Sequence, residues 1–287
     1  MRPQAEAMRA VLAEPGLRVV PGCGDGLAAR LVEEAGFRIG FASGSSISAM
    51  RLAWPDVDQL TFPDMLDATR QMIVAAPNVC WLADGDTGYG NAISVQNTIR
   101  GYARAGAAAV LIEDKQWPRP LGKNNAKLVV ERDEARLRCR AAAAAAREEG
   151  ILLLARTDAR TSRGFDEALA RLNDFIEEGA DLLFLDSPAT EAEMRASIEA
   201  CQGRPAIAVT NPAGKHFMPA DDVLAAIGIK LAFYPQEILA STVLAVRAAL
   251  AGLKTGQRAP MASAAELGTA LRTAEYLALD EALAGKA

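Results

Sequence analysis

The chain alternates short apolar runs with longer stretches in which apolar residues recur at helical spacing. Each apolar run has four or five residues and ends at a polar or glycine-rich segment, which is typical of a buried strand. The predicted strands are 17–20, 39–42, 79–83, 109–112, 151–155, 182–185, 206–209 and 229–233. The predicted helices are 27–35, 61–76, 97–105, 131–149, 165–178, 190–201, 219–227 and a last one ending near 251. Glycines placed as left-handed C-caps follow four of these helices, at Gly36, Gly106, Gly179 and Gly228.

This alternation of strand and helix predicts the fold. Repeated βα units imply parallel strands, and eight of them favour a closed (β/α)8 barrel of the TIM type over an open sheet. No linker-like composition interrupts the units, so we predict one domain over residues 1–287. A further helical segment at 264–283 is additional to the eight units and rich in leucine. We expect it to be an oligomerisation helix that docks on a partner subunit, because its apolar surface is too large to leave in water.

Composition removes several classes of function. The net charge is -5 and no long basic cluster occurs, which argues against nucleic acid and anionic membrane surfaces as partners. No apolar leader and no run of transmembrane length is present, and the four cysteines are scattered without a CxxC pair. A cytoplasmic location is therefore expected. The single histidine, His216, excludes a His-rich metal site.

The run from Trp81 to Asn91 (WLADGDTGYGN) carries the first chemical signal. It starts as a predicted strand and breaks into Asp84, Asp86 and three glycines. Two acids at the end of a buried strand are costly unless an arginine, helix-end NH groups or a hard divalent cation lies beside them. A simple Asp-Gly turn, in which the carboxylates bond their own backbone, is the alternative.

A second acidic strand end strengthens the metal interpretation. In a barrel of this type the active site lies at the carboxyl ends of the strands. The side chains expected there are Ser43, Asp84, Asp86, Glu113, Arg156, Asp186, Asn211 and Tyr234. Carboxylates from adjacent strands suit a magnesium-type site, although an ion-pair network around Arg156 would use the same residues. The irregular segment 115–127, between strand four and its helix, is long enough to predict a lid over the mouth.

These segments together resemble the isocitrate lyase/phosphoenolpyruvate mutase superfamily over nearly the whole chain. The resemblance is carried by Ser43-Gly44-Ser45, the DGDTGYGN segment, Ile112-Glu113-Asp114-Lys115, Ala155-Arg156-Thr157-Asp158-Ala159 and Tyr234-Pro235. It implies a Mg²⁺-dependent (β/α)8 enzyme, with Mn²⁺ as an alternative ion. Such enzymes make or break C–C or P–C bonds next to a 2-oxo or 2-hydroxy acid through an enolate. It also implies a homotetramer whose subunits exchange a C-terminal helix.

The resemblance assigns roles residue by residue. Asp84, Asp86 and Glu113 would hold the metal, mostly through waters, and Arg156 would bind substrate oxygens. Glu113 and Arg156 are also expected to be catalytic, with Asp56 as a further acid of the site. The substrate carboxylate is expected at Ser43, Gly44 and Ser45, with Asn211 as another substrate contact. The gating loop contributes Lys115, Arg119, Leu121, Gly122 and Lys123.

Two positions depart from the lyase pattern. Lyases of isocitrate and 2-methylisocitrate carry Lys-Arg-Cys-Gly-His in the loop, and the Cys donates a proton; here Leu121 stands in its place. Many lyases also have Glu where this chain has Asp186. The predicted function is a Mg²⁺-dependent C–C bond lyase acting on a small 2-hydroxy or 2-oxo di- or tricarboxylic acid. Alternatives are an oxaloacetate decarboxylase or hydrolase, a phosphonomutase, or a non-catalytic oxo-acid binding protein.

Overall fold

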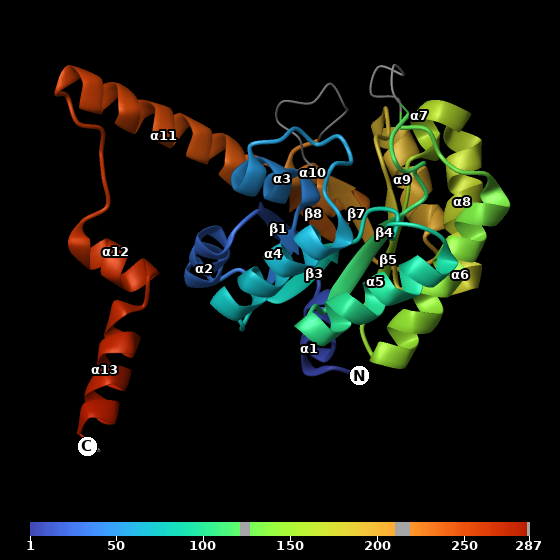
Figure 1. Ribbon diagram of the computed structural model, residues 1–287. Helices are drawn as coiled ribbons and strands as arrows, with labels where there is room; N and C mark the ends of the chain where they lie inside the picture. The colour runs from blue at the N-terminus through green and yellow to red at the C-terminus, as the bar shows by residue number, and fades with distance from the viewer. Residues whose placement is uncertain (121–126, 210–218, 286–287) are drawn as a thin grey trace.

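The computed structural model describes residues 1–120, 127–209 and 219–285 of the chain. Eight parallel strands close into a barrel in chain order, and β1 pairs with β8 with Arg18 opposite Leu231 (Figure 1). The strands are β1 (Arg18–Cys23), β2 (Ile39–Ala42), β3 (Cys80–Asp84), β4 (Ala109–Glu113), β5 (Leu152–Thr157), β6 (Leu182–Leu185), β7 (Ala206–Val209) and β8 (Leu231–Tyr234). The predicted (β/α)8 barrel is confirmed.

Seven helices follow the first seven strands and cover the outside of the barrel (Figure 1). They are α2 (Gly26–Glu34), α4 (Phe62–Ala75), α5 (Ala92–Ala105), α6 (Arg132–Glu149), α8 (Phe165–Glu178), α9 (Glu191–Ala200) and α10 (Asp221–Ile227). Gly106, Gly179 and Gly228 are left-handed C-caps as predicted. One apolar layer lies between strands and helices, and a second fills the barrel, so the strands are buried on both faces.

Three helices were not predicted from the sequence. α1 (Pro3–Ala13) packs Met8 and Val11 against the residues inside the barrel and closes the end opposite the expected site. α3 (Gly44–Leu52) begins directly after β2, in a stretch for which no helix was predicted. α7 (Ala159–Arg163) is a single short turn after β5.

The C-terminal part departs most from expectation. The helix after the eighth strand, α11 (Glu237–Thr255), runs away from the barrel instead of lying against it (Figure 1). The segment predicted as one helix is two, α12 (Ala264–Ala270) and α13 (Thr273–Ala284). We call α11, α12 and α13 together the C-terminal arm.

Most of the arm's apolar side chains are exposed in a single chain. Leu244 and Leu253 of α11 are each 68% exposed, and Leu277 of α13 is 59% exposed. By length and composition alone α11 could cross a membrane, a test that core helices of soluble proteins also pass. Only 6% of its most apolar window is buried. The arm therefore presents an apolar surface that this chain does not cover.

Candidate active site

The two aspartates of the DGDTGYGN segment lie at the carboxyl end of β3. Asp84 is the last residue of the strand, and its Oδ2 accepts a hydrogen bond of 2.9 Å from the Gly44 amide at the start of α3. The Asp86 amide lies 3.4 Å from Asp84 Oδ1. Gly85 lets the backbone between them pass close to β4, because a Cβ there would lie 2.6 Å from the Leu111 carbonyl oxygen. The turn thus delivers two carboxylates to one edge of the barrel mouth.

Burial and mutual repulsion both disfavour the ionised form of these carboxylates. Burial, and then the charge of Glu113, raises the pKa of Asp84 to about 6. Burial and the neighbouring Asp84 raise the pKa of Asp86 well above its usual value. A cation beside them would relieve this repulsion, and carboxylate oxygens are ligands that Mg²⁺ accepts. Among the described residues, no three acids, histidines or cysteines are grouped closely enough to bind an ion directly. Carboxylates of this kind fit a hard cation only if waters or substrate oxygens complete its ligands.

Glu113 ends the next strand and is linked to the start of the loop that follows. Its Oε1 lies 2.8 Å from Nζ of Lys115, whose other acidic neighbour is Asp58 Oδ1 at 3.1 Å. Burial alone would lower the pKa of Lys115, but Glu113 and Asp86 raise it above its usual value, so the lysine stays charged. Asp58 also accepts a 2.7 Å hydrogen bond from the Arg119 amide. Lys115 thus connects a candidate metal ligand to the base of the predicted lid.

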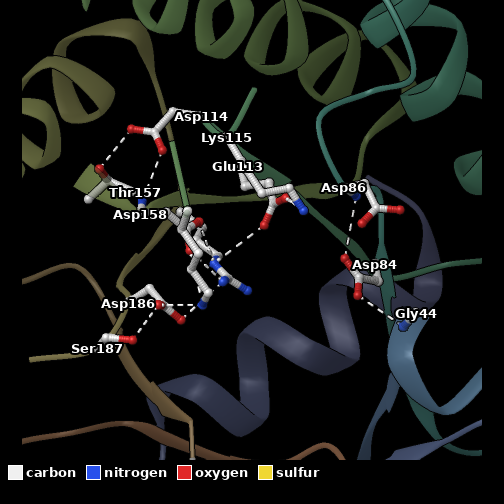
Figure 2. Close-up of polar contacts among 12 residues, drawn as sticks. Gly44, Asp84, Asp86, Glu113, Asp114, Lys115, Thr157, Asp158, Asp186 and Ser187 are labelled. Atoms are coloured by element: carbon white, nitrogen blue, oxygen red, sulfur yellow. Dashed lines mark hydrogen bonds and ion pairs between the residues drawn. The ribbon is translucent and has the colours of Figure 1, made fainter. Parts of the chain in front are cut away.

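Arg156, at the end of β5, faces these acids from the other side. Its Nη2 lies 2.7 Å from Asp158 Oδ1 and 3.0 Å from Asp186 Oδ1, and its Nε lies 3.5 Å from Glu113 Oε2. Lys127 Nζ contacts the same two aspartates, at 3.2 and 2.5 Å. In Figure 2, Glu113 lies between Asp84 and Asp86 on one side and Asp186 on the other.

Opposite charges decide the ionisation of this half of the site. Burial would raise the pKa of Asp158, but Arg156 and Lys127 hold it below its usual value. Likewise burial would lower the pKa of Arg156, and the charges of Asp158, Asp186 and Glu113 raise it. Within the described part of the chain, Arg156 Nη1 makes no hydrogen bond. That nitrogen can therefore donate to a ligand oxygen.

A second layer of buried polar side chains lies behind the site and was not predicted from the sequence. Asp114 accepts hydrogen bonds from Thr157 Oγ1 at 2.7 Å and from the Asp158 amide at 2.9 Å, and Arg171 Nη1 lies 3.1 Å from it. Burial raises the pKa of Asp114 to about 6. Arg138 donates to the carbonyls of Glu113 and Lys115, at 2.8 and 2.9 Å. Arg138 and Arg171 lie on helices at ordinary helical spacing, so no local signal marks them as buried supports.

The start of α3 supplies the third side of the mouth. Ser43 and Gly44 are buried, and Ser43 Oγ lies 3.1 Å from Ser45 Oγ. Asp56 is exposed and lines a hollow with Gly44 and Asp86. The predicted site residues Leu121, Gly122, Lys123 and Asn211 lie outside the described residues. The other predicted residues lie at the carboxyl ends of their strands: Ser43 follows β2, Asp84 ends β3, Glu113 ends β4, Arg156 lies near the end of β5, Asp186 follows β6, and Tyr234 ends β8.

A barrel with this set of acids and Arg156 defines a class of enzyme, and comparison with known proteins gives its family. Residues 8–254 match the family model described as phosphoenolpyruvate phosphomutase. The chain therefore belongs to the phosphoenolpyruvate phosphomutase family, and it is an enzyme of the isocitrate lyase/phosphoenolpyruvate mutase superfamily.

Curated relatives include plant and bacterial proteins. The petal death protein of Dianthus caryophyllus is 41% identical over 188 residues, which are 66% of this chain and 59% of that protein, so the match spans less than two thirds of its length. The 2,3-dimethylmalate lyase of Eubacterium barkeri is 35% identical over 231 residues, which are 80% of this chain and 79% of that protein.

Solved structures share the fold over nearly the whole chain. Oxaloacetate acetylhydrolase with the inhibitor 3,3-difluorooxalacetate has a TM-score of 0.91 at 29% identity, covering 98% of this chain and 97% of that chain. Phosphonopyruvate hydrolase with oxalate and Mg²⁺ has a TM-score of 0.85 at 26% identity, covering 98% of this chain and 99% of that chain.

Proposed function

We propose that this enzyme is a Mg²⁺-dependent lyase that cleaves a C–C bond in a small 2-hydroxy or 2-oxo di- or tricarboxylic acid. The observation that carries the proposal is the charge arrangement at the mouth. Carboxylates crowd at the ends of β3 and β4, with raised pKa values for Asp84 and Asp86, and Arg156 faces them from β5. This arrangement suits a bound cation and an anionic substrate together.

The metal would be held by Asp84, Asp86 and Glu113, partly through water. When bound, Mg²⁺ would supply positive charge beside substrate oxygens and favour a form in which one of them becomes anionic. Solved phosphonopyruvate hydrolase, a relative in fold, contains Mg²⁺ with oxalate. Mn²⁺ accepts the same oxygen donors and is expected to substitute.

The chain's own groups would orient the substrate and stabilise the developing charge. Arg156 Nη1 can donate to a substrate oxygen while Asp158 and Asp186 hold the rest of the guanidinium in place. Ser43, Gly44 and Ser45 at the start of α3 offer hydroxyl and backbone groups to a carboxylate. In cleavage of a 2-hydroxy acid, the hydroxyl proton leaves to a carboxylate base, for which Glu113 is the candidate. The C–C bonding pair then moves onto the departing fragment as a carboxylate-stabilised carbanion, which takes its proton from water or another acid, and the former alkoxide carbon becomes a carbonyl.

A second candidate is hydrolysis or decarboxylation of oxaloacetate. The oxaloacetate acetylhydrolase structure superimposes over nearly the whole chain. Leucine at position 121 cannot donate a proton to a leaving carbanion, whereas loss of CO₂ leaves an enolate that needs no acid from the loop. A non-catalytic oxo-acid binding protein is disfavoured, since the chain belongs to a family of enzymes and retains all three candidate metal acids.

The decisive experiment is a substrate panel. Purified protein with Mg²⁺ would be offered substituted malates, isocitrate, 2-methylisocitrate, oxaloacetate and phosphonopyruvate, with pyruvate, glyoxylate, oxalate and CO₂ as readouts. Pyruvate from a substituted malate, abolished by EDTA, supports the lyase. Release of oxalate or CO₂ from oxaloacetate alone would transfer the assignment to the second candidate. Full turnover in metal-free buffer would contradict both.

We also propose that the chain works as a homotetramer in which the C-terminal arm of one subunit packs on another. The exposed leucines of α11 and α13 support this assembly, since water is a poor environment for them. Such packing would cover α11 without a membrane.

A further inference from the structure

Four aromatic side chains form a cluster behind the two aspartates of the mouth. Tyr89 follows the DGDTG turn, Phe62 starts α4, Tyr102 lies in α5, and Trp117 lies in the segment that follows β4. The ring of Tyr89 lies 5.7 Å from Phe62 and 6.1 Å from Trp117, the latter edge to face. Phe62 lies 5.4 Å from Tyr102. The cluster therefore joins the metal-site turn to three other elements.

The two tyrosine hydroxyls bond to different parts of the aspartate turn. Tyr89 Oη donates a 2.7 Å hydrogen bond to Asp86 Oδ2, a side-chain oxygen. Tyr102 Oη donates a 2.9 Å hydrogen bond to the main-chain carbonyl of Asp84. Within the described residues, Asp86 Oδ1 accepts no hydrogen bond. Of the two tyrosines, Tyr89 is thus the one that bonds a candidate ligand carboxylate directly.

The backbone of the turn is bent to make this contact. Asp86 and Tyr89 have positive φ values of 45° and 57°, which non-glycine residues rarely adopt. The bend is held by hydrogen bonds from Gly88 N to the Gly85 carbonyl and from Glu113 N to the Asp86 carbonyl, both 2.8 Å. Backbone strain of this kind persists where the surroundings over-determine the conformation.

We propose that Tyr89 is a positioning residue for the metal site. Its hydroxyl donates a hydrogen bond to Asp86 Oδ2 and so leaves Oδ1 to face the cation or a water bound to it. The inference rests on the proposed metal dependence. Groups that hydrogen-bond a ligating carboxylate fix its orientation, and losing one typically costs about 10–100-fold in metal affinity. Trp117, in edge contact with Tyr89, would report the change by its fluorescence.

The test compares two variants that each lose one tyrosine hydroxyl. Mg²⁺ affinity is measured by calorimetry, and Mn²⁺ affinity by electron paramagnetic resonance, for wild type, Tyr89→Phe and Tyr102→Phe. Tyr89→Phe should bind both ions about 10-fold or more weakly, whereas Tyr102→Phe should stay within about threefold. Both variants are checked by circular dichroism, and each keeps its aromatic ring.

Fluorescence supplies a second readout that a general loss of stability would not reproduce. Adding Mg²⁺ should change the tryptophan emission of wild type, and Trp117→Phe should remove most of that change. Tyr89→Phe should reduce it even at saturating Mg²⁺, because the hydroxyl no longer links Asp86 to the ring.

The outcomes separate this inference from the proposed function. Wild type that binds no Mg²⁺ would overturn the metal assignment itself. Wild type that binds Mg²⁺ while Tyr89→Phe binds it equally or more tightly would overturn only the role of Tyr89. Equal weakening in both tyrosine variants would indicate loosening of the aromatic cluster, and would also overturn it.

Discussion

The barrel mouth and the C-terminal arm place charged and apolar side chains in opposite ways. At the mouth, charged groups are buried and paired: the side chain of Asp158 is 0% exposed and contacts both Arg156 and Lys127. In the arm, apolar groups are exposed and uncovered, as Leu244 and Leu253 show. A buried charge is tolerated when it is paired, but an exposed apolar surface of this extent is not stable in water. The mouth is therefore largely completed by its own chain, apart from the proposed cation, whereas the arm carries the apolar surface on which we propose that a partner subunit packs.

The largest effect is expected from a substitution at the barrel mouth that leaves the C-terminal arm unchanged. Asp84→Asn should lower turnover by at least about 10³-fold, because the amide cannot supply the charge that holds the cation. The raised pKa of Asp84 means that its ionised form destabilises the metal-free fold at neutral pH, so in EDTA the variant should be at least as stable as wild type. Steady-state kinetics and thermal unfolding measure the two effects. Turnover near the wild-type rate would contradict the metal assignment.

The second prediction concerns a deletion in the C-terminal arm that leaves the residues of the barrel mouth unchanged. Deleting residues 264–287 removes α12 and α13 and exposes the surface they cover on a partner, so the oligomeric state should fall. The midpoint of thermal unfolding should drop by at least about 4 °C, since assembly contributes to apparent stability. Analytical ultracentrifugation gives the mass, with Asp84→Asn as the control that should keep it. A full-length protein that sediments as a monomer would refute the proposed tetramer.

The barrel could be predicted well from the sequence for two reasons. Each strand is a short apolar run, because it is buried on both faces, and each run is followed by a polar or glycine-rich segment and then a helix. The residues at the strand ends followed from topology, since parallel strands must bring Asp84, Glu113 and Arg156 to one edge. The buried arginines behind the site were not predicted, because their burial depends on tertiary contacts. Arg138 and Arg171 become buried supports only because helices α6 and α8 pack behind β4 and β5.

The arm shows a different limit of sequence reasoning. Periodicity identified a helix after the eighth strand but could not tell whether its apolar side faces this barrel or another chain. Likewise the Ser-Gly-Ser-Ser sequence after β2 has low helix propensity, yet α3 forms there, with Gly44 donating to Asp84. A contact between distant residues overrides the local preference.

A third prediction concerns the contacts between the mouth and the segment that follows β4. Asp58, whose side chain is 2% exposed, contacts Lys115 and bonds the Arg119 amide. Asp58→Asn should cost about 1–3 kcal/mol of unfolding free energy, because Lys115 loses one of its two acidic partners but keeps Glu113. Chemical denaturation measures this loss. The exposed Asp166, at the start of α8, offers a matched Asp→Asn control that should change little.

The fourth prediction is a pH dependence of metal binding at the mouth. The pKa of Asp84 is raised to about 6 in the metal-free protein, so below that pH a cation must displace a proton. Mg²⁺ affinity should fall as the pH drops below about 6, by up to about tenfold per pH unit for each proton released. Calorimetry in two buffers of different ionisation enthalpy counts those protons. Affinity unchanged down to pH 5 would show that the carboxylates are already ionised.

The smallest effect is expected where the arm makes its polar contact with the barrel. Arg272, at the start of α13, pairs with Glu33 of α2. Partly exposed ion pairs contribute about 0–1 kcal/mol, so Arg272→Gln should shift the unfolding midpoint by less than about 4 °C and leave both assembly and turnover unchanged. Glutamine keeps an unbranched side chain at a residue with φ of 53°, so the backbone cost of that conformation is the same in both proteins. If the leucines of the arm drive assembly, Leu253→Arg should dissociate subunits where Arg272→Gln does not. Dissociation by Arg272→Gln alone would mean that a single ion pair, and not apolar burial, positions the arm.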